Sequence, residues 1–183
     1  MADLLKTSLK FEGDFDPDSQ LRDAVEAAFM DMAAEVTGRF NDAISGEYWP
    51  WPDSTPRFGS TGGSTVADAA KQWNAWLDGS GTAQGVAGSP RSIVDSGELK
   101  QSMNFQLDLA ALEATWTWNA DYAAAVHEGA YISPFGNPTK VVELPARPWT
   151  TAVLQGNTVA SGIPVYDAPT RLQRLIEENS RDV

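Results

Sequence analysis

The feature that most constrains this chain is a long series of apolar residues at helical spacing near its N-terminus. They recur at steps of three or four, which places them on one face of an α-helix; they are Leu21, Val25, Phe29, Met32, Val36, Phe40 and Ile44. Asp16 and Pro17 supply a cap and a first-turn proline, and Gly46 supplies a stop. The sequence therefore predicts a helix over residues 17–44. At about 40 Å it is too long for a small core to cover, so we expect one end to contact a neighbour or a partner subunit.

Composition limits what such a helix can belong to. The chain has 183 residues, enough for one compact domain, and a formal net charge of −12 from 25 acidic and 13 basic residues. This acidity opposes general adhesion to nucleic acid or to anionic membranes. The sequence has no cysteine, which excludes disulfides and thiolate sites. With no apolar run of membrane-spanning length, we expect a soluble protein without a signal peptide.

The remaining patterns predict short strands and helices around this helix. Residues 4–11 indicate an edge strand or an arm, and residues 48–88 a long loop insertion with a short helix inside it. Alternating apolar residues predict a hairpin from Met103 to Trp118 with one buried face. Residues 95–100 are typical of a capped helical turn, in which Asp95 and Ser96 are the capping candidates.

The C-terminal part continues in the same style. The sequence predicts a short helix over residues 122–128 capped by Asp121 and closed by Gly129, then a looser hairpin over residues 131–143. Pro148 predicts a helix that begins at Trp149 and ends at Gly156. After a linker, residues 169–180 form an amphipathic stretch with an apolar stripe, which consists of Leu172, Leu175 and Ile176.

Together these patterns predict an α+β fold, in which a long N-terminal helix packs on a small antiparallel β-sheet with short helices. An extended loop and a C-terminal arm complete it. We expect a single domain over residues 1–156, with the loop insertion at residues 48–88, and a linker and amphipathic arm over residues 157–183. The insertion and the arm are candidates for contacts with adjacent subunits.

Residues suited to catalysis are sparse. His127 is the only histidine; with Glu128 it resembles the start of a zinc-protease helix, but Tyr131 stands where the second histidine ligand belongs. A triad of Ser96, His127 and Asp121 can be drawn, yet Ser96 lacks the Gly-x-Ser-x-Gly elbow and its capping role explains it. We therefore predict a protein that is not an enzyme and has no catalytic residue, no metal site and no cofactor. A hydrolase that uses His127 is the remaining enzymatic alternative.

Four features in order along the chain carry a family resemblance. Residues 96–102 match a T/S-G-x-L-x-x-S turn, and residues 122–129 match a Y-A-x-x-x-E-x-G pattern except that glycine directly follows Glu128. Residues 144–149 match P-A-R-P-F, with Trp149 in place of phenylalanine. Preceded by a long helix, this order is similar to that of the neck and tail-completion proteins of long-tailed bacteriophages, a family that includes tail terminators and head-tail joining proteins.

The resemblance implies a virion structural protein that forms an oligomeric, hexameric ring at the head-tail junction and lets the genome pass. It implies assembly in the host cytoplasm and contacts with an adjacent connector ring and with tail tube or sheath proteins, but none with membranes. A terminator, a stopper and an adaptor ring remain open, as do contractile and flexible tails. A ring of such acidic subunits would have a negative lumen that repels the passing DNA.

Candidate interface residues follow from the aromatic clusters, the proline-flanked arginine and the apolar stripe of the arm. Arg147, fixed between Ala146 and Pro148, suits a bidentate contact with a carboxylate within or between subunits. The full set of interface candidates is Trp49, Trp51, Arg147, Trp149, Leu172 and Leu175. The alternative function is a non-viral soluble binding module in which the loop of Trp49 and Trp51 contacts a small ligand or glycan.

Overall fold

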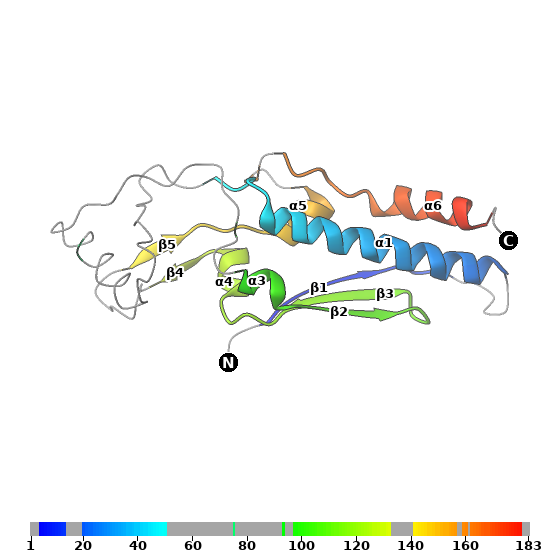
Figure 1. Ribbon diagram of the computed structural model, residues 1–183, viewed down its shortest axis with the longest axis horizontal. Helices are drawn as coiled ribbons and strands as arrows, with labels where there is room; N and C mark the ends of the chain where they lie inside the picture. Colours follow the sequence, from blue (N-terminus) through cyan, green and yellow to red (C-terminus); the bar gives the residue numbers. More distant parts are fainter. Residues whose placement is uncertain are drawn as a thin grey trace.

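The protein has the α+β architecture that its sequence predicts. The structure, a computed structural model, describes residues 4–13, 20–50, 75, 93, 97–132, 141–156, 159–160 and 162–180. Figure 1 shows the helix α1 between the sheet on one side and α6 on the other. The elements in chain order are β1 (Leu5–Lys10), α1 (Gln20–Ser45), α3 (Glu98–Gln101), β2 (Met103–Asp108), β3 (Glu113–Trp118), α4 (Ala123–Glu128), β4 (Ala130–Ile132), β5 (Val142–Leu144), α5 (Trp149–Gln155) and α6 (Ala168–Asn179).

The long helix α1 forms as expected, and its apolar stripe becomes the centre of the core. From Val25 to Ile44 every residue of the stripe is buried, whereas Leu21 in the first turn is half exposed. The predicted cap at Asp16 and Pro17 lies outside the described residues. Elements of the same chain cover the stripe from two sides, and the contact expected at one end of the helix stays a prediction.

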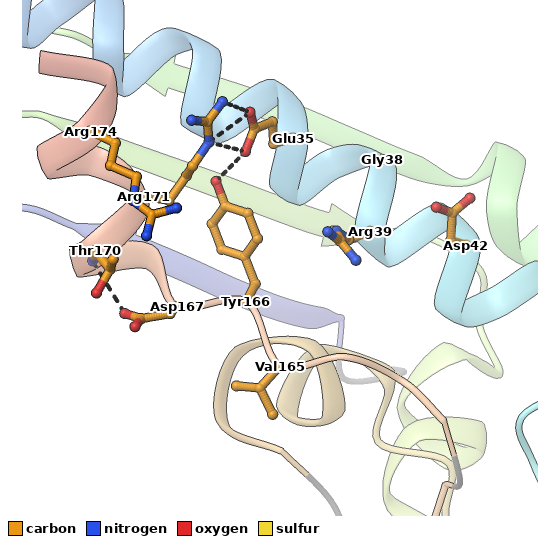
Figure 2. A pocket seen from close by; sticks show the side chains of 10 residues that line it. All are labelled: Glu35, Gly38, Arg39, Asp42, Val165, Tyr166, Asp167, Thr170, Arg171 and Arg174. Atoms are coloured by element: carbon orange, nitrogen blue, oxygen red, sulfur yellow. Dashed lines mark hydrogen bonds and ion pairs between the residues drawn. The ribbon is translucent and has the colours of Figure 1, made fainter. Parts of the chain in front are cut away.

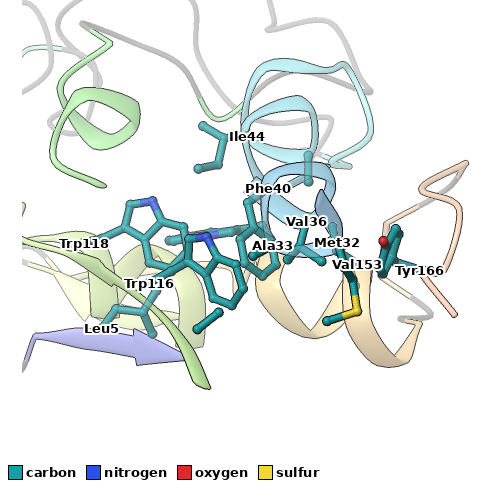
Figure 3. Close-up of a cluster of buried hydrophobic side chains, with 14 of the residues drawn as sticks. Leu5, Met32, Ala33, Val36, Phe40, Ile44, Trp116, Trp118, Val153 and Tyr166 are labelled. Atoms are coloured by element: carbon teal, nitrogen blue, oxygen red, sulfur yellow. The ribbon is translucent and has the colours of Figure 1, made fainter. Parts of the chain in front are cut away.

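The sheet covers one side of α1. β3 lies in the middle and pairs antiparallel with both β1 and β2, which confirms the predicted hairpin and the edge strand. Trp116 and Trp118 of β3 point toward α1, where the Phe40 ring contacts both edge-on at centroid distances of 5.3 and 5.6 Å. Figure 3 shows the Trp116 and Trp118 rings beside Phe40. The Trp116 indole donates to Thr37 Oγ1 at 2.8 Å, so its polar atom is satisfied in the core.

The short elements follow the predicted order with one correction. α3 begins after Gly97, whose φ of +83° only glycine adopts freely, and its N-terminus has no side-chain cap. Asp95 and Ser96 lie outside the described residues. The predicted cap at Asp121 is also not formed, since α4 begins after Tyr122 without a side-chain cap. The second hairpin is present as β4 and β5, and Pro148 precedes α5 as expected.

The helix α6 is where the structure differs most from expectation. The amphipathic helix forms, with Asp167 accepting a hydrogen bond from the Thr170 backbone N–H at its N-terminus. Its apolar stripe packs on α1 of the same chain, and Leu172 and Leu175 belong to the common core. Residues 168–180 are therefore part of the body in the single chain. The contact of this arm with another subunit stays a prediction.

Both ends of the long insertion are anchored at the C-terminal end of α1. The Trp49 indole donates to the Ala43 carbonyl at 2.7 Å, and the Ile93 backbone N–H donates to the Ile44 carbonyl at 3.0 Å. These two bonds hold the departing and the returning chain at neighbouring residues of one helix. Most of the predicted loop, residues 48–88, and its short helix lie outside the described residues.

Candidate functional site

A groove of about 620 Å³ lies between α1 on one side and α6 with the segment that leads into it on the other. Figure 2 shows its side chains projecting from α1 on one side and from α6 with its preceding turn on the other. The lining residues are Glu35, Gly38, Arg39, Asp42, Val165, Tyr166, Asp167, Thr170, Arg171 and Arg174. Polar and apolar surface contribute about equally to the lining, and three arginines meet three carboxylates in it.

The centre of the groove is an ion pair between the two helices. Arg171 Nη2 lies 2.6 Å from Glu35 Oε1, and Arg171 Nε lies 3.0 Å from both carboxylate oxygens. The Tyr166 hydroxyl donates to Glu35 Oε2 at 2.8 Å. Glu35 therefore receives donors from two positions on the α6 side, one charged and one neutral, and this geometry fixes α6 along α1.

These contacts shift the pKa values of the three groups. Hydrogen bonding from Arg171, aided by the Tyr166 hydroxyl, holds the pKa of Glu35 below its ordinary value, although burial opposes this. Burial and the bond to Glu35 raise the pKa of the Tyr166 hydroxyl, and the bond to Glu35 raises the pKa of Arg171. At neutral pH the carboxylate and the guanidinium are therefore charged and the phenol is neutral. None of the three is prepared for proton transfer.

The groove thus has the chemistry of a structural contact. Its positive and negative side chains balance, and Arg171 already holds the most central carboxylate. In the described ranges, no group of three histidines, aspartates or glutamates is placed to hold a metal ion. We assign the groove the role of positioning α6.

His127, the one candidate base, lies inside the framework. Its Nε2 is 2.8 Å from Thr150 Oγ1, and its ring contacts Trp149 edge-on at a centroid distance of 4.8 Å. Burial lowers its pKa against the opposing charge of Glu128. Ser96 lies outside the described residues, so the triad cannot be built from them. His127 makes the contacts of a packed residue that links α4 to α5.

Arg147 and Trp149 are also buried within the chain. Arg147 is only 2% exposed, its Nη1 donates to the Pro145 carbonyl at 3.3 Å, and its backbone N–H donates to the Val126 carbonyl at 2.9 Å. Trp149 is fully buried and contacts the Trp118 ring edge-on. In the single chain both side chains are enclosed by their own fold, and their place on a subunit interface stays a prediction.

No protein-family model, curated protein or solved structure matches the chain. Among the helices that the structure describes, none combines the length and hydrophobicity that a membrane crossing requires.

Three of the other interface candidates are also buried within the chain. Trp49 is fully buried against α1, and Leu172 and Leu175 are buried under α6. Trp51 lies outside the described residues. An apolar stripe or a tryptophan next to proline indicates that a side chain is covered, but it does not distinguish cover by the same chain from cover by a partner. In the single chain the same chain covers Trp49, Leu172 and Leu175, and an interface role for them stays a prediction.

Sequence reasoning missed the ion pair of the groove. Glu35 lies on α1 beside the apolar stripe, and Arg171 directly precedes Leu172. A charged residue at the border of an apolar helical face often pairs across the helix contact, and this is the one signal that was present. The pattern gave no partner for either residue, because their pairing requires knowing that α6 lies against α1.

Proposed function

We propose that this chain is a virion structural protein that forms an oligomeric ring at the head-tail junction of a bacteriophage, as a neck or tail-terminator protein. In this role it joins the connector to the tail, lets DNA pass and catalyses no reaction. The proposal rests on the order of the motifs in the sequence and on how the described residues of those motifs are used.

One observation carries the proposal: two of the motifs contact each other directly. Gly129, which ends the motif of residues 122–129, has a φ of +81°, and a Cβ atom there would lie 3.0 Å from the backbone nitrogen of Ala146 in the P-A-R-P-W segment. The Arg147 N–H bonds to the Val126 carbonyl at the same junction. The glycine and the proline-flanked segment are therefore needed for one joint in the framework, which is what a family of ring-forming scaffolds would require.

The alternative of a ligand-binding module loses support. Its platform required exposed Trp49 and Trp51 rings, and Trp49 is buried with its indole N–H bonded inside the chain. The net charge of −12 also supports a ring, because a negative lumen would repel the DNA phosphates and let DNA slide without binding. Imaging of particles distinguishes a terminator, a stopper and an adaptor ring by their positions in the neck.

The test is assembly together with location. The purified full chain is examined by native mass spectrometry at several concentrations, and purified particles are examined by peptide mass spectrometry and by imaging of the neck. We expect a closed oligomer, formed alone or with neck proteins, and peptides of this chain in particles. A chain that stays a monomer in every mixture and is missing from particles would contradict the proposal. So would turnover of an ester, peptide or glycan that His127→Gln abolishes.

A further inference from the structure

The three-stranded sheet has two open edges. β3 is paired on both sides, whereas β1 and β2 each pair with β3 alone, and no described strand lies beyond either of them. In Figure 1, β2 forms the outermost strand of the sheet, on the side away from α1. An unpaired edge presents backbone N–H and C=O groups that another strand can bind.

The two edges differ in charge. β1 has two exposed lysines, Lys6 and Lys10, on the face of the sheet that points away from α1. β2 has no lysine, no proline and no break in its register, and its one charged residue is Asp108 at the end. Phe105, on the other face of β2, has 38% of its surface exposed. β2 thus lacks the features that commonly protect an edge strand.

Charges across the sheet form an incomplete row. Lys10 is paired in register with Glu113, and Glu113 with Asp108, so the row across β1, β3 and β2 is positive, negative, negative. Like charges directly opposite on neighbouring strands are unfavourable. A cation beyond Asp108 would complete the row. Lys10 occupies the same position along β1 as Asp108 does along β2, because both pair with Glu113, so β1 of another copy could supply this cation.

We propose that β2 of one copy pairs with β1 of the next, so that the sheet continues from subunit to subunit around the ring. This inference rests on the proposed ring function. Both strands are antiparallel to β3 and run in the same direction, so a rotation about an axis parallel to the strands sets them side by side in parallel. The contact joins two different surfaces, which is the type that closes into rings.

The other face of the sheet fits the same register. In the register that places Asp108 beside Lys10 of the next copy, Phe105 lies beside Thr7 and Leu107 beside Leu9 of that copy. An aromatic ring beside a β-branched residue is a favourable neighbouring pair in a sheet, and the exposed part of Phe105 would be covered. Pairing of two β1 strands is disfavoured, because antiparallel pairing centred on Ser8 sets Lys6 opposite Lys10 of the other copy.

Charge reversal in trans tests this contact. In the Asp108→Lys variant, the introduced lysine of one copy faces Lys10 of the next. In the Lys10→Asp variant, Asp108 of one copy faces the introduced aspartate of the next. Both contacts join like charges, so each variant alone should assemble about tenfold more weakly or worse. In an equimolar mixture the two variants can alternate around the ring. Each contact then joins one lysine and one aspartate, either with both charges reversed or with both unchanged. Assembly should therefore return to the wild-type level. Because this rescue occurs between different chains, an effect within one chain cannot produce it.

Two controls accompany the mixture. The double variant Lys10→Asp/Asp108→Lys restores opposite charges at every contact and should assemble alone as the wild type does. The pair Lys100→Asp and Asp121→Lys makes the same changes of net charge at exposed positions away from the strands and should leave assembly unchanged. Native mass spectrometry measures the oligomers. Circular dichroism verifies the folding of each variant, because Asp108 also accepts the Ala111 backbone N–H within its own turn.

The outcomes separate this inference from the proposed function. Single variants that assemble like the wild type, or a loss that neither the mixture nor the double variant repairs, would overturn the edge contact and leave the ring intact. A wild-type chain that forms no oligomer in any mixture would overturn both.

Discussion

Arg171 of α6 binds Glu35 of α1 through Nη2 and Nε, although the two residues are 136 positions apart in the chain. The contact ties the last helix to the first long one, and the Tyr166 hydroxyl adds a third donor to the same carboxylate. The ion pair and the buried side chains of Leu172 and Leu175 together hold α6 against α1.

This ion pair makes part of the stability depend on pH. The folded-state pKa of Glu35 is lowered from 4.5, so its stabilising contribution is fully present above that value and is lost as the pH falls through the folded-state pKa. We expect the wild type to be more stable than Glu35→Gln at pH 7, with the difference shrinking below pH 4.5. Urea unfolding at a series of pH values measures it. In an Arg171→Met background the difference should be much smaller at every pH, and an unchanged difference would contradict the assigned partner.

The Tyr166 hydroxyl has a separate, smaller effect. Tyr166→Phe removes one hydrogen bond to a charged group and leaves the buried ring in place, so we expect a loss of about 1 kcal/mol in the free energy of unfolding. The matched control is Tyr131→Phe, because Tyr131 is 77% exposed; its change should stay within about 0.5 kcal/mol. Equal effects of the two substitutions would argue against the bond to Glu35.

Two glycines should respond to alanine in opposite directions. Gly129→Ala forces a residue with a Cβ atom to a φ of +81° and against the Ala146 backbone, so we expect a loss of about 2 kcal/mol or more. Gly38 lies within α1 with nothing within 4 Å of its Cβ position, so Gly38→Ala should stabilise by about 1 kcal/mol. Thermal unfolding of both variants distinguishes a backbone requirement from a general effect of added volume.

The packing of α6 predicts that its stripe contributes to global stability. Leu175→Ala leaves a cavity between α6 and α1 and should cost about 2–4 kcal/mol, whereas Gln173→Ala on the exposed face should change little. Chemical denaturation measures both. If Leu175→Ala left stability unchanged but prevented assembly, α6 would be an arm that binds another subunit, as the sequence had indicated.

Trp49 should behave as a core residue. Trp49→Phe removes the indole bond to the Ala43 carbonyl and some buried volume, so we expect a loss of about 1–2 kcal/mol with no change in oligomeric state. Denaturation and native mass spectrometry of the same sample provide both readouts. A changed oligomer at wild-type stability would restore the interface role that the sequence suggested.

The elements that were predicted correctly are those specified by local pattern. Three patterns each determine a structure within a few residues: the periodicity of α1, the alternation around Trp116 and Trp118, and the prolines just before α5 and in the first turn of α6. The errors concern what covers an apolar surface. Leu175 requires cover, but the stripe does not say whether α1 or another subunit provides it. Glu35 and Arg171 each border an apolar helical face, but that position does not identify the partner of either residue.

The paired anchors at the end of α1 have an evolutionary consequence. Trp49 and Ile93 hold the chain at adjacent carbonyls of α1, so the points where it leaves and rejoins this helix lie close together. The entropic cost of closing the intervening chain rises only slowly with its length. Insertions and deletions can therefore accumulate between the two points while both anchoring bonds stay in place.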